Sequence, residues 1–318
     1  MSAGSTPSVS VIIPVFNGAA TICEALESVF AQTYSDFEVI VVNDGSTDAT
    51  RALLGSYESK AVILDQPNRG PATARNVGIR ASRGEYLAFL DADDKWQPSM
   101  LERTVPILVH DPECVLVYTD LAVVDSTGQS LNTSLVSKAQ AYAPSMEDLL
   151  ARMWPIMPSA VVMRRSAFES AGGFCEEFTT ANYEDAHFWL LAREQGPFRY
   201  VPECLAVWRF SLFPKPLKRA GGNPQSQRIF ARLVEQRYGV SAAKLVGART
   251  RAARSMLGFL GLSALHRGDR QLARRAFSNA LHIDPFRLKN YLRFVRTFLP
   301  APLIGLLTGR TRNLKHSV

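Results

Sequence analysis

Short apolar runs rich in β-branched residues alternate with segments of helical periodicity through the first ninety residues of the chain. The runs predict buried strands at 8–14, 38–42, 61–64 and 86–90. The segments between them, in which apolar residues recur every three or four positions, predict helices at 20–31, 49–57 and 72–81. This alternation predicts an α/β fold built on a mostly parallel, doubly wound sheet.

Polar loops follow three of these predicted strands, around Asn17, around Asp44 and from Asp91 to Asp94. In open α/β sheets, ligands bind beyond the carboxyl ends of the strands, so these loops predict a nucleotide site. The chain has no Gly-x-Gly-x-x-Gly after its first strand and no Gly-x-x-x-x-Gly-Lys-Ser/Thr. Their absence argues against dinucleotide oxidoreductases and P-loop enzymes.

The strand at 86–90 ends in three carboxylates within four residues, those of Asp91, Asp93 and Asp94. Carboxylates this crowded repel one another, so a cation is expected beside them. Mg²⁺ or Mn²⁺ bridging a diphosphate is the natural candidate, because these hard ions take oxygen ligands from carboxylates and phosphates. The alternative is a polar turn that follows a strand, since Asp-x-Asp alone is a weak motif.

The pattern downstream predicts further strands, at 115–120, continuing as a hairpin through 121–128, at 158–163 and at 201–210. A helix is predicted at 165–171, and residues 129–150 predict nothing clear. Glu184 and Asp185 open another predicted helix. Carboxylates favour a helix N-terminus through its dipole, which gives this acidic pair a structural interpretation beside a catalytic one.

Four sequence motifs occur in order and at a familiar spacing. They are Ser10-Val11-Ile12-Ile13-Pro14-Val15-Phe16-Asn17, Val41-Val42-Asn43-Asp44-Gly45-Ser46-Thr47-Asp48, Ala74-Arg75-Asn76-x-Gly78 and Leu90-Asp91-Ala92-Asp93-Asp94. Together they resemble the family 2 inverting glycosyltransferases, whose GT-A fold, a Rossmann-like α/β domain, binds a nucleotide sugar. The resemblance covers about residues 9–209, and it is the ordered set that makes it specific.

The resemblance implies a set of donor-binding residues and one metal ligand, Asp93. The donor-binding residues are Pro14, Val15, Phe16, Asn17, Asp44, Arg75, Asp91 and Ala92. Phe16 would stack on a uracil ring; many relatives have Tyr here, and Phe keeps the stacking face. Asp44 would accept a hydrogen bond from the base, and Asp91 would contact the ribose. The structural alternative for Asp44 is an Asx turn, and for Arg75 a solvated helix charge.

The resemblance also implies a catalytic pair, with Asp185 as the general base and Glu184 orienting the acceptor. Gly173 and Phe174 belong to a Gly-Gly-Phe that resembles the family motif before the catalytic helix, so they are expected near the acceptor. His187 stands where many relatives carry Asp. It could touch the acceptor or tune Asp185, although a lone His is more often structural. The absence of Gln-x-x-Arg-Trp favours transfer of a single sugar over processive synthesis.

Charge divides the chain of 318 residues into two parts. From Arg209 onward there are 22 Lys and Arg but three Asp and Glu, a balance of +19, whereas the first 208 residues carry −12. This split predicts a catalytic domain at 1–214 and a basic helical region at 215–318. The four cysteines are scattered, which predicts reduced thiols, and the N-terminus lacks the pattern of a signal peptide.

Helical periodicity fills the basic region, with helices predicted at 226–238, 242–266, 270–282 and 286–298. Small and apolar residues between 257 and 285 match the spacing of one tetratricopeptide-like helical pair; an ordinary helical hairpin is the alternative. Segment 286–315 is apolar but interrupted by Arg and Pro, so it predicts an interfacial segment at an anionic membrane surface rather than a span. A solvated face or a partner-docking helix are the alternatives, and nucleic acid is an unlikely partner because no reader motif is present.

The resemblance implies a metal-dependent inverting glycosyltransferase, and the inversion rests on the resemblance alone. It would use Mn²⁺ or Mg²⁺ and a UDP-sugar, and act on a saccharide or lipid-linked acceptor in surface polysaccharide or glycan synthesis. The expected location is the cytoplasm, with peripheral binding at the cytoplasmic membrane face. Two alternatives are a sugar-nucleotide-binding protein without turnover and a helical adaptor whose basic tail is the functional part.

Overall fold

A computed structural model describes most of the chain and divides it into two compact units. The described residues are 7–124, 128–132, 142–152, 156–180, 183–209, 224–241, 247, 257–258, 261–262, 264–265, 268–283, 286 and 288–299. The first unit comprises Met1–Phe210 with Gly222–Ala248, and the second comprises Ser211–Gly221 with Arg249–Val318. Predicted features at 125–127, 210–223, 300–318 and most of the helix at 242–266 lie outside the described residues.

The first unit is built on a nine-stranded mixed sheet with the order β3-β2-β1-β4-β8-β6-β9-β5, and β7 pairs with β6. The strands are β1 (Val9–Val15), β2 (Phe37–Asp44), β3 (Val62–Gln66), β4 (Tyr86–Phe89), β5 (Lys95–Trp96), β6 (Leu116–Val124), β7 (Ser130–Asn132), β8 (Val161–Arg164) and β9 (Phe198–Arg209). Strands β1 to β4 are parallel, as predicted. The second half is mixed, because β8 runs antiparallel to both β4 and β6.

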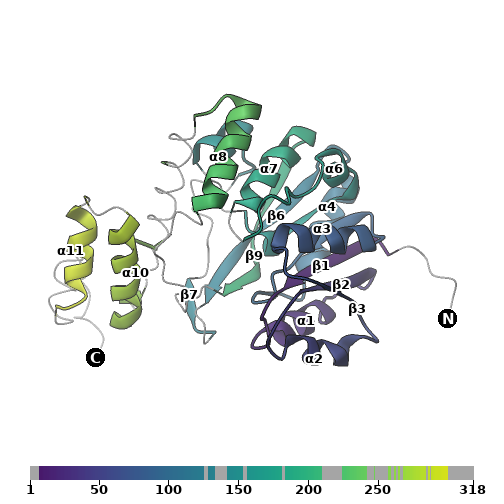
Figure 1. Cartoon of the computed structure of the whole chain (residues 1–318), viewed down its shortest axis with the longest axis horizontal. Coiled ribbons are helices and arrows are strands. Elements are labelled where there is room, and N and C mark those ends of the chain that lie inside the picture. The colour runs from purple at the N-terminus through teal and green to yellow at the C-terminus, as the bar shows by residue number, and fades with distance from the viewer. Residues whose placement is uncertain are drawn as a thin grey trace, which may run out of the picture. The chain divides into compact units, whose positions relative to one another are not determined.

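Helices cover both faces of this sheet, and Figure 1 shows α1 and α2 on one side of strands β1 to β3 and α3 on the other. The helices of this unit are α1 (Ile22–Phe30), α2 (Thr50–Leu54), α3 (Pro71–Ala81), α4 (Met100–His110), α5 (Met146–Arg152), α6 (Arg165–Ser170), α7 (Glu184–Gln195) and α8 (Pro224–Tyr238), with 3₁₀ turns η1 (Gly55–Tyr57) and η3 (Pro158–Ala160). The doubly wound arrangement is therefore confirmed.

Strand β1 shows how the sequence pattern produces two cores. Val11 and Ile13 join the apolar cluster that includes α1 and α4, whereas Ile12 joins the cluster that includes α3, α6 and α7. Successive side chains of a strand point to opposite faces, so a continuous apolar run is buried on both sides. This accounts for the β-branched composition that marks the strand in the sequence.

Four elements lie where the sequence pattern predicted nothing: β5, β7, α4 and α5. In addition, α8 belongs to the first unit, although the sequence placed residues 215–318 in a separate helical region. Phe230 of α8 packs on Tyr183, the residue directly before α7, with ring centroids 5.1 Å apart. All four cysteines are free, which agrees with the expectation of reduced thiols.

The second unit contains α10 (Arg270–Ile283) and α11 (Leu288–Arg296), which lie side by side in Figure 1. Ala273, Phe277 and Ala280 are buried, and a Cβ on Gly261 would lie 2.5 Å from the Phe277 ring. Small residues thus let two segments approach closely, as predicted for this pair. In the described part of the chain, no helix is both long enough and apolar enough to cross a membrane.

Gly70 offers a test of how tightly the fold holds the loop before α3. Its φ is +89°, and a Cβ there would lie 2.3 Å from the backbone oxygen of Thr179. Gly70→Ala is expected to lower the free energy of unfolding by about 1 kcal/mol for the positive φ and by a further 1–3 kcal/mol, roughly, for the clash. Urea denaturation followed by circular dichroism measures this loss.

Gly172→Ala is the matched control, since φ is +83° and no atom lies within 4 Å of the added Cβ. It should show only the backbone cost of about 1 kcal/mol. Equal losses in the two variants would contradict the close contact between Gly70 and Thr179.

Candidate active site

The loops after β1 and β2 are joined by hydrogen bonds into one rigid edge of the site. The backbone N–H of Asn17 donates to Ser46 Oγ at 2.9 Å, and Asn17 Oδ1 accepts from the N–H of Thr47 at 2.8 Å. Asn17 itself has a φ of +53°, a conformation that Asn tolerates better than most residues. Beside it, the Phe16 side chain is 49% exposed, which leaves an aromatic face open to a ligand.

Asp44 ends β2 and is almost fully buried. Its carboxylate accepts hydrogen bonds from Gln66 Nε2 at 2.7 Å and from the backbone N–H groups of Arg69 and Gly70, both at 2.9 Å. Three donors thus hold the loop that leads from β3 to α3. The carboxylate therefore shapes this edge of the site, whatever further hydrogen bond it accepts from a base.

Arg75 on α3 lies in the interior of the site between two acidic residues. Its Nη2 lies 2.7 Å from Asp91 Oδ1, and its Nη1 lies 3.1 Å from Glu184 Oε1. The guanidinium also lies over the Phe174 ring at 5.5 Å. Burial would lower the pKa of Arg75, but the charges of Asp91 and Glu184 outweigh it and raise the pKa. Arg75 is therefore a buried cation that joins the end of β4 to the start of α7, and not a solvated helix charge.

The three carboxylates after β4 have three different environments. Asp94 is buried, accepts from Ser159 Oγ at 2.6 Å and from the Arg209 N–H at 2.9 Å, and has a pKa raised by burial and by the other two carboxylates. Asp91 pairs with Arg75. Asp93 is exposed, yet surrounding protein atoms and then the Asp91 carboxylate raise its pKa to about 6.

The carboxylate of Asp93 fits as a ligand of a divalent ion. Among the residues that the structure describes, no three His, Cys, Asp or Glu side chains are grouped to hold a metal by themselves. Mg²⁺ and similar ions commonly use only one or two protein carboxylates and take their other ligands from substrate phosphates. The raised pKa of Asp93 indicates a carboxylate whose charged form a cation would stabilise.

Glu184 and Asp185 open α7, as the sequence predicted. Glu184 is buried; desolvation and then the adjacent Asp185 raise its pKa to about 7, against the opposing effect of Arg75. Its Oε2 and the Nε of Arg75 are buried atoms without a hydrogen-bond partner in the described structure. Such atoms are rare in folded proteins, and they suit a site completed by a bound polar group. Asp185 is half-buried, and its Oδ1 accepts the Ala186 N–H at 2.7 Å.

Phe174, from the Gly-Gly-Phe segment, packs beneath the Arg75 guanidinium. Its ring is buried against Phe188, with centroids 4.4 Å apart. Asn76 fixes its backbone, accepting from the Phe174 N–H at 3.1 Å and donating to the Phe174 carbonyl at 2.8 Å. Phe174 is therefore a packing platform for Arg75 rather than an open acceptor surface. Asn76, which stands in the Ala-Arg-Asn motif, was not among the predicted site residues.

His187 is also buried, with its ring 5.8 Å from that of Phe178. Burial and then the charge of Arg237 on α8 lower its pKa to about 4, so the imidazole is neutral at pH 7. Its Nδ1 has no hydrogen-bond partner among the described residues. This environment fits the structural interpretation of a lone His, and Gly173 remains a prediction for the acceptor side.

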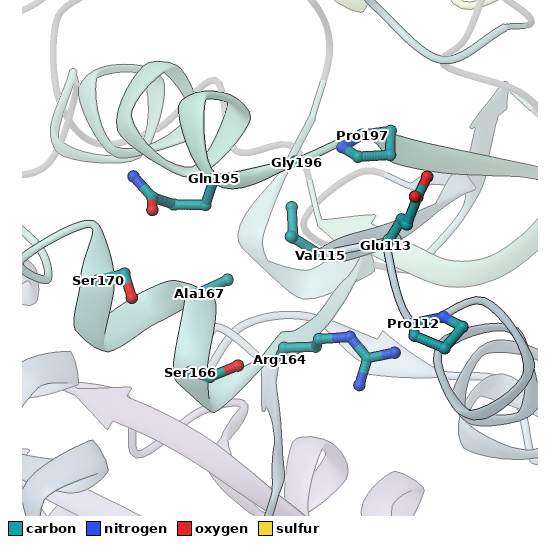
Figure 2. Close-up of a pocket in the computed structure, with 10 residues that line it drawn as sticks. All are labelled: Pro112, Glu113, Val115, Arg164, Ser166, Ala167, Ser170, Gln195, Gly196 and Pro197. Atoms are coloured by element: carbon teal, nitrogen blue, oxygen red, sulfur yellow. The ribbon is translucent and has the colours of Figure 1, made fainter.

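A cavity of about 460 Å³ lies elsewhere, and Figure 2 shows its lining. Val115 precedes β6, Ser166 lies on α6, and Gln195 ends α7. Strand β6 runs parallel to β4, because each is antiparallel to β8. Val115 therefore lies at the amino-terminal ends of these parallel strands, whereas Asp91 lies at their carboxyl-terminal ends. This cavity is separate from the candidate site.

Comparisons with known proteins agree with this geometry. The profile of the family described as "Glycosyl transferase family 2" matches residues 10–172, about half of the chain. The chain belongs to glycosyl transferase family 2. That match contains the strand-end loops, Arg75 and Ser159, whereas Glu184 and Asp185 lie beyond it.

Two relatives described as glycosyltransferases are similar to this chain. A putative teichuronic acid biosynthesis glycosyltransferase of Bacillus subtilis, TuaG, is 35% identical over 209 residues, which cover 64% of this chain and 79% of that protein. An uncharacterized glycosyltransferase of Rickettsia typhi is 39% identical over 157 residues, 49% of this chain and 48% of that one. The chain spans about half or less of the length of several curated relatives that it matches.

Solved structures confirm the GT-A fold expected of glycosyl transferase family 2. S. aureus TarS 1–349 in complex with UDP has a TM-score of 0.54 at 17% identity, covering 98% of this chain and 94% of that one. Mannosyltransferase PcManGT from Pyrobaculum calidifontis, in complex with GDP-Man and Mn²⁺, has a TM-score of 0.55 at 20% identity, covering 98% and 89%. At these identities the likeness establishes the fold alone.

The environment of Glu184 predicts a pH-dependent stability. Its carboxyl keeps a proton in the folded state up to about pH 7 but loses it near pH 4.5 when unfolded. Between these values the folded state binds more protons at this carboxyl, so the contribution of Glu184 to stability falls as pH rises, by up to about 3 kcal/mol, and then levels off. The buried His187, whose pKa is lowered to about 4, acts in the opposite direction. The measurement is therefore the free energy of unfolding of wild type minus that of Glu184→Gln, from urea denaturation between pH 4.5 and 8, and this difference should fall as pH rises.

Glu235→Gln, an exposed position on α8, is the control and should run parallel to wild type. A Glu184→Gln curve that also parallels wild type would show that the Glu184 proton is not retained in the folded protein.

Proposed function

We propose that this protein is a metal-dependent inverting glycosyltransferase. It transfers one sugar, a hexose or a related residue, from a UDP-sugar to a hydroxyl of a saccharide or lipid-linked acceptor. The observation that carries the proposal is the pairing of Arg75 with both Asp91 and Glu184. That pairing fixes the strand end expected to hold the donor beside the helix that opens with Glu184 and Asp185.

Asp185 is the general base in this proposal. Its carboxylate accepts the proton of the acceptor hydroxyl while that oxygen attacks the anomeric carbon. The bond from the anomeric carbon to the diphosphate oxygen breaks in the same displacement, and the nucleoside diphosphate leaves with the electron pair. Attack from the face opposite the leaving group inverts the configuration. Glu184 would orient the acceptor through a hydrogen bond, and its Oε2, which is buried and unpartnered in the described structure, supports this role.

Asp93 would hold the divalent ion together with the donor diphosphate. A bound Mn²⁺ or Mg²⁺ would supply electrostatic stabilisation of the leaving diphosphate. Arg75 cannot take over that task from its present position, because its guanidinium is buried and engaged by two carboxylates.

The donor side of the proposal rests on Phe16 and the two joined loops. An exposed aromatic ring beside a fixed backbone edge suits stacking of a nucleobase. Structures with the same fold hold UDP in TarS and GDP-Man in PcManGT, which supports a nucleotide sugar. We favour uridine, with the ribose at Asp91, and the name of TuaG supports a role in surface polysaccharide synthesis.

Asp93→Asn tests the metal and the donor together. With Mn²⁺, one UDP-sugar should raise the melting temperature of wild-type protein by several degrees, as expected for ligand at about 100-fold its dissociation constant. The variant should lose this metal-dependent shift because it lacks the carboxylate ligand. If GDP-sugars shifted the wild type and UDP-sugars did not, the uridine assignment would be wrong.

Asp185→Asn tests the general base. The neutral amide cannot take up the acceptor proton, so kcat should fall by roughly 10²–10⁴ while the donor-dependent thermal shift is retained. Release of UDP in the presence of acceptor measures turnover. Full turnover in Asp185→Asn would exclude this base, and a wild type that binds donor but never releases UDP would favour a binding protein without catalysis.

A further inference from the structure

Helix α11 in the second unit is packed with its polar side inward. Asn290 and Thr297 are buried, and Asn290 Nδ2 donates to the carbonyl of Ala280 on α10 at 3.2 Å. Arg274 Nη2 reaches the Thr297 carbonyl at 3.5 Å, and Phe294 packs partly against the small core around Phe277. The side of α11 that meets α10 therefore carries the Asn290 amide and the Phe294 ring, and the buried Thr297 lies in the turn directly after the helix.

The opposite side of α11 is apolar and exposed. The exposed fractions are 71% for Leu288, 45% for Tyr291, 54% for Leu292 and 55% for Val295. Their spacing of three and four residues places them on one stripe. An amphipathic helix normally buries its apolar stripe against the protein. An apolar stripe that is exposed instead is typical of an interaction site.

Basic residues flank this stripe on one side only. Lys289, Arg293 and Arg296 lie about 100° around the helix from the apolar stripe, between it and the packed side. Neither α10 nor α11 contains an acidic residue, and α10 adds Arg270, Arg274 and Arg275. The chemistry that complements an apolar stripe bordered by cations is an acyl layer beneath anionic headgroups.

We propose that the exposed stripe of α11 binds the surface of an anionic lipid bilayer. Leu288, Leu292 and Val295 enter the acyl boundary, Tyr291 lies at the headgroup level, and Lys289 and Arg296 meet lipid phosphates. The proposal deepens the proposed function only in that a lipid-linked acceptor would be met at the same surface. Binding to lipid itself requires neither donor nor catalysis.

Vesicle co-sedimentation of the full chain tests this inference. Wild-type protein should bind vesicles of phosphatidylcholine mixed with phosphatidylglycerol and bind pure phosphatidylcholine at least about tenfold more weakly. Leu288→Ser/Leu292→Ser should lower the partition coefficient on the mixed vesicles by at least about tenfold, because two leucine side chains no longer leave water. Lys289→Glu/Arg296→Glu should lower binding by a similar factor. High salt should weaken the binding of wild-type protein to the mixed vesicles, because it screens the attraction between these cations and the lipid phosphates.

Val109→Ser is the matched control, since Val109 lies on helix α4 of the other unit and is 54% exposed, as is Leu292. It should bind vesicles like wild type. No binding to mixed vesicles, or equal binding by the Leu288→Ser/Leu292→Ser variant, would overturn the proposal. A dimer in size-exclusion chromatography that this variant dissociates, without vesicle binding, would assign the stripe to a second copy of the chain.

The donor-dependent thermal shift is measured on the same preparations. A normal shift with no vesicle binding would overturn only the lipid proposal. Vesicle binding without any donor shift would overturn only the proposed transferase activity.

Discussion

The candidate site depends on one buried cation, Arg75, held between Asp91 and Glu184. A buried charge is costly unless it is paired, and removing one partner leaves the others uncompensated. The two ion pairs link residues from the middle of α3, the end of β4 and the start of α7. Phe174 contacts Arg75 and Asn76 of α3, so the same contacts that build the core also fix the acidic pair near the end of β4. Position and charge are thereby set together.

The acidic segment after β4 divides its charges among three tasks. Asp94 is held by Ser159 and by the backbone at Arg209, which anchors this segment to η3 and to the end of β9. Asp91 is neutralised by Arg75. Asp93 is the most exposed of the three, and the surrounding protein and then the Asp91 carboxylate raise its pKa. Asp94 and Asp91 thus have partners within the protein, and Asp93 is the carboxylate that we propose as the metal ligand.

Local pattern was sufficient to predict strands β1 to β4, β6, β8 and β9, the strand-end loops and the acidic start of α7, because each depends on a few consecutive residues. Pairing between Arg75 and Glu184, 109 positions apart, has no local signal, and neither has the burial of His187. Strand β5 has two residues and exists through its pairing with β9. Helix α4 contains Pro106 within its apolar pattern, a residue that usually ends helices and so obscures one.

Helix α11 marks a second limit of sequence patterns. Its periodicity identifies two faces but not which of them meets the protein, and the usual assumption would bury the leucines. In the structure the Asn290 amide lies on the buried face instead, because it donates a hydrogen bond to the Ala280 carbonyl on α10. The exposed apolar stripe of α11 lies in the part of the chain that carries the positive charge. An anionic surface would repel the residues before 209, which carry −12, and attract those after, which carry +19. Electrostatics and the exposed stripe therefore favour the same end of the chain for contact with lipid.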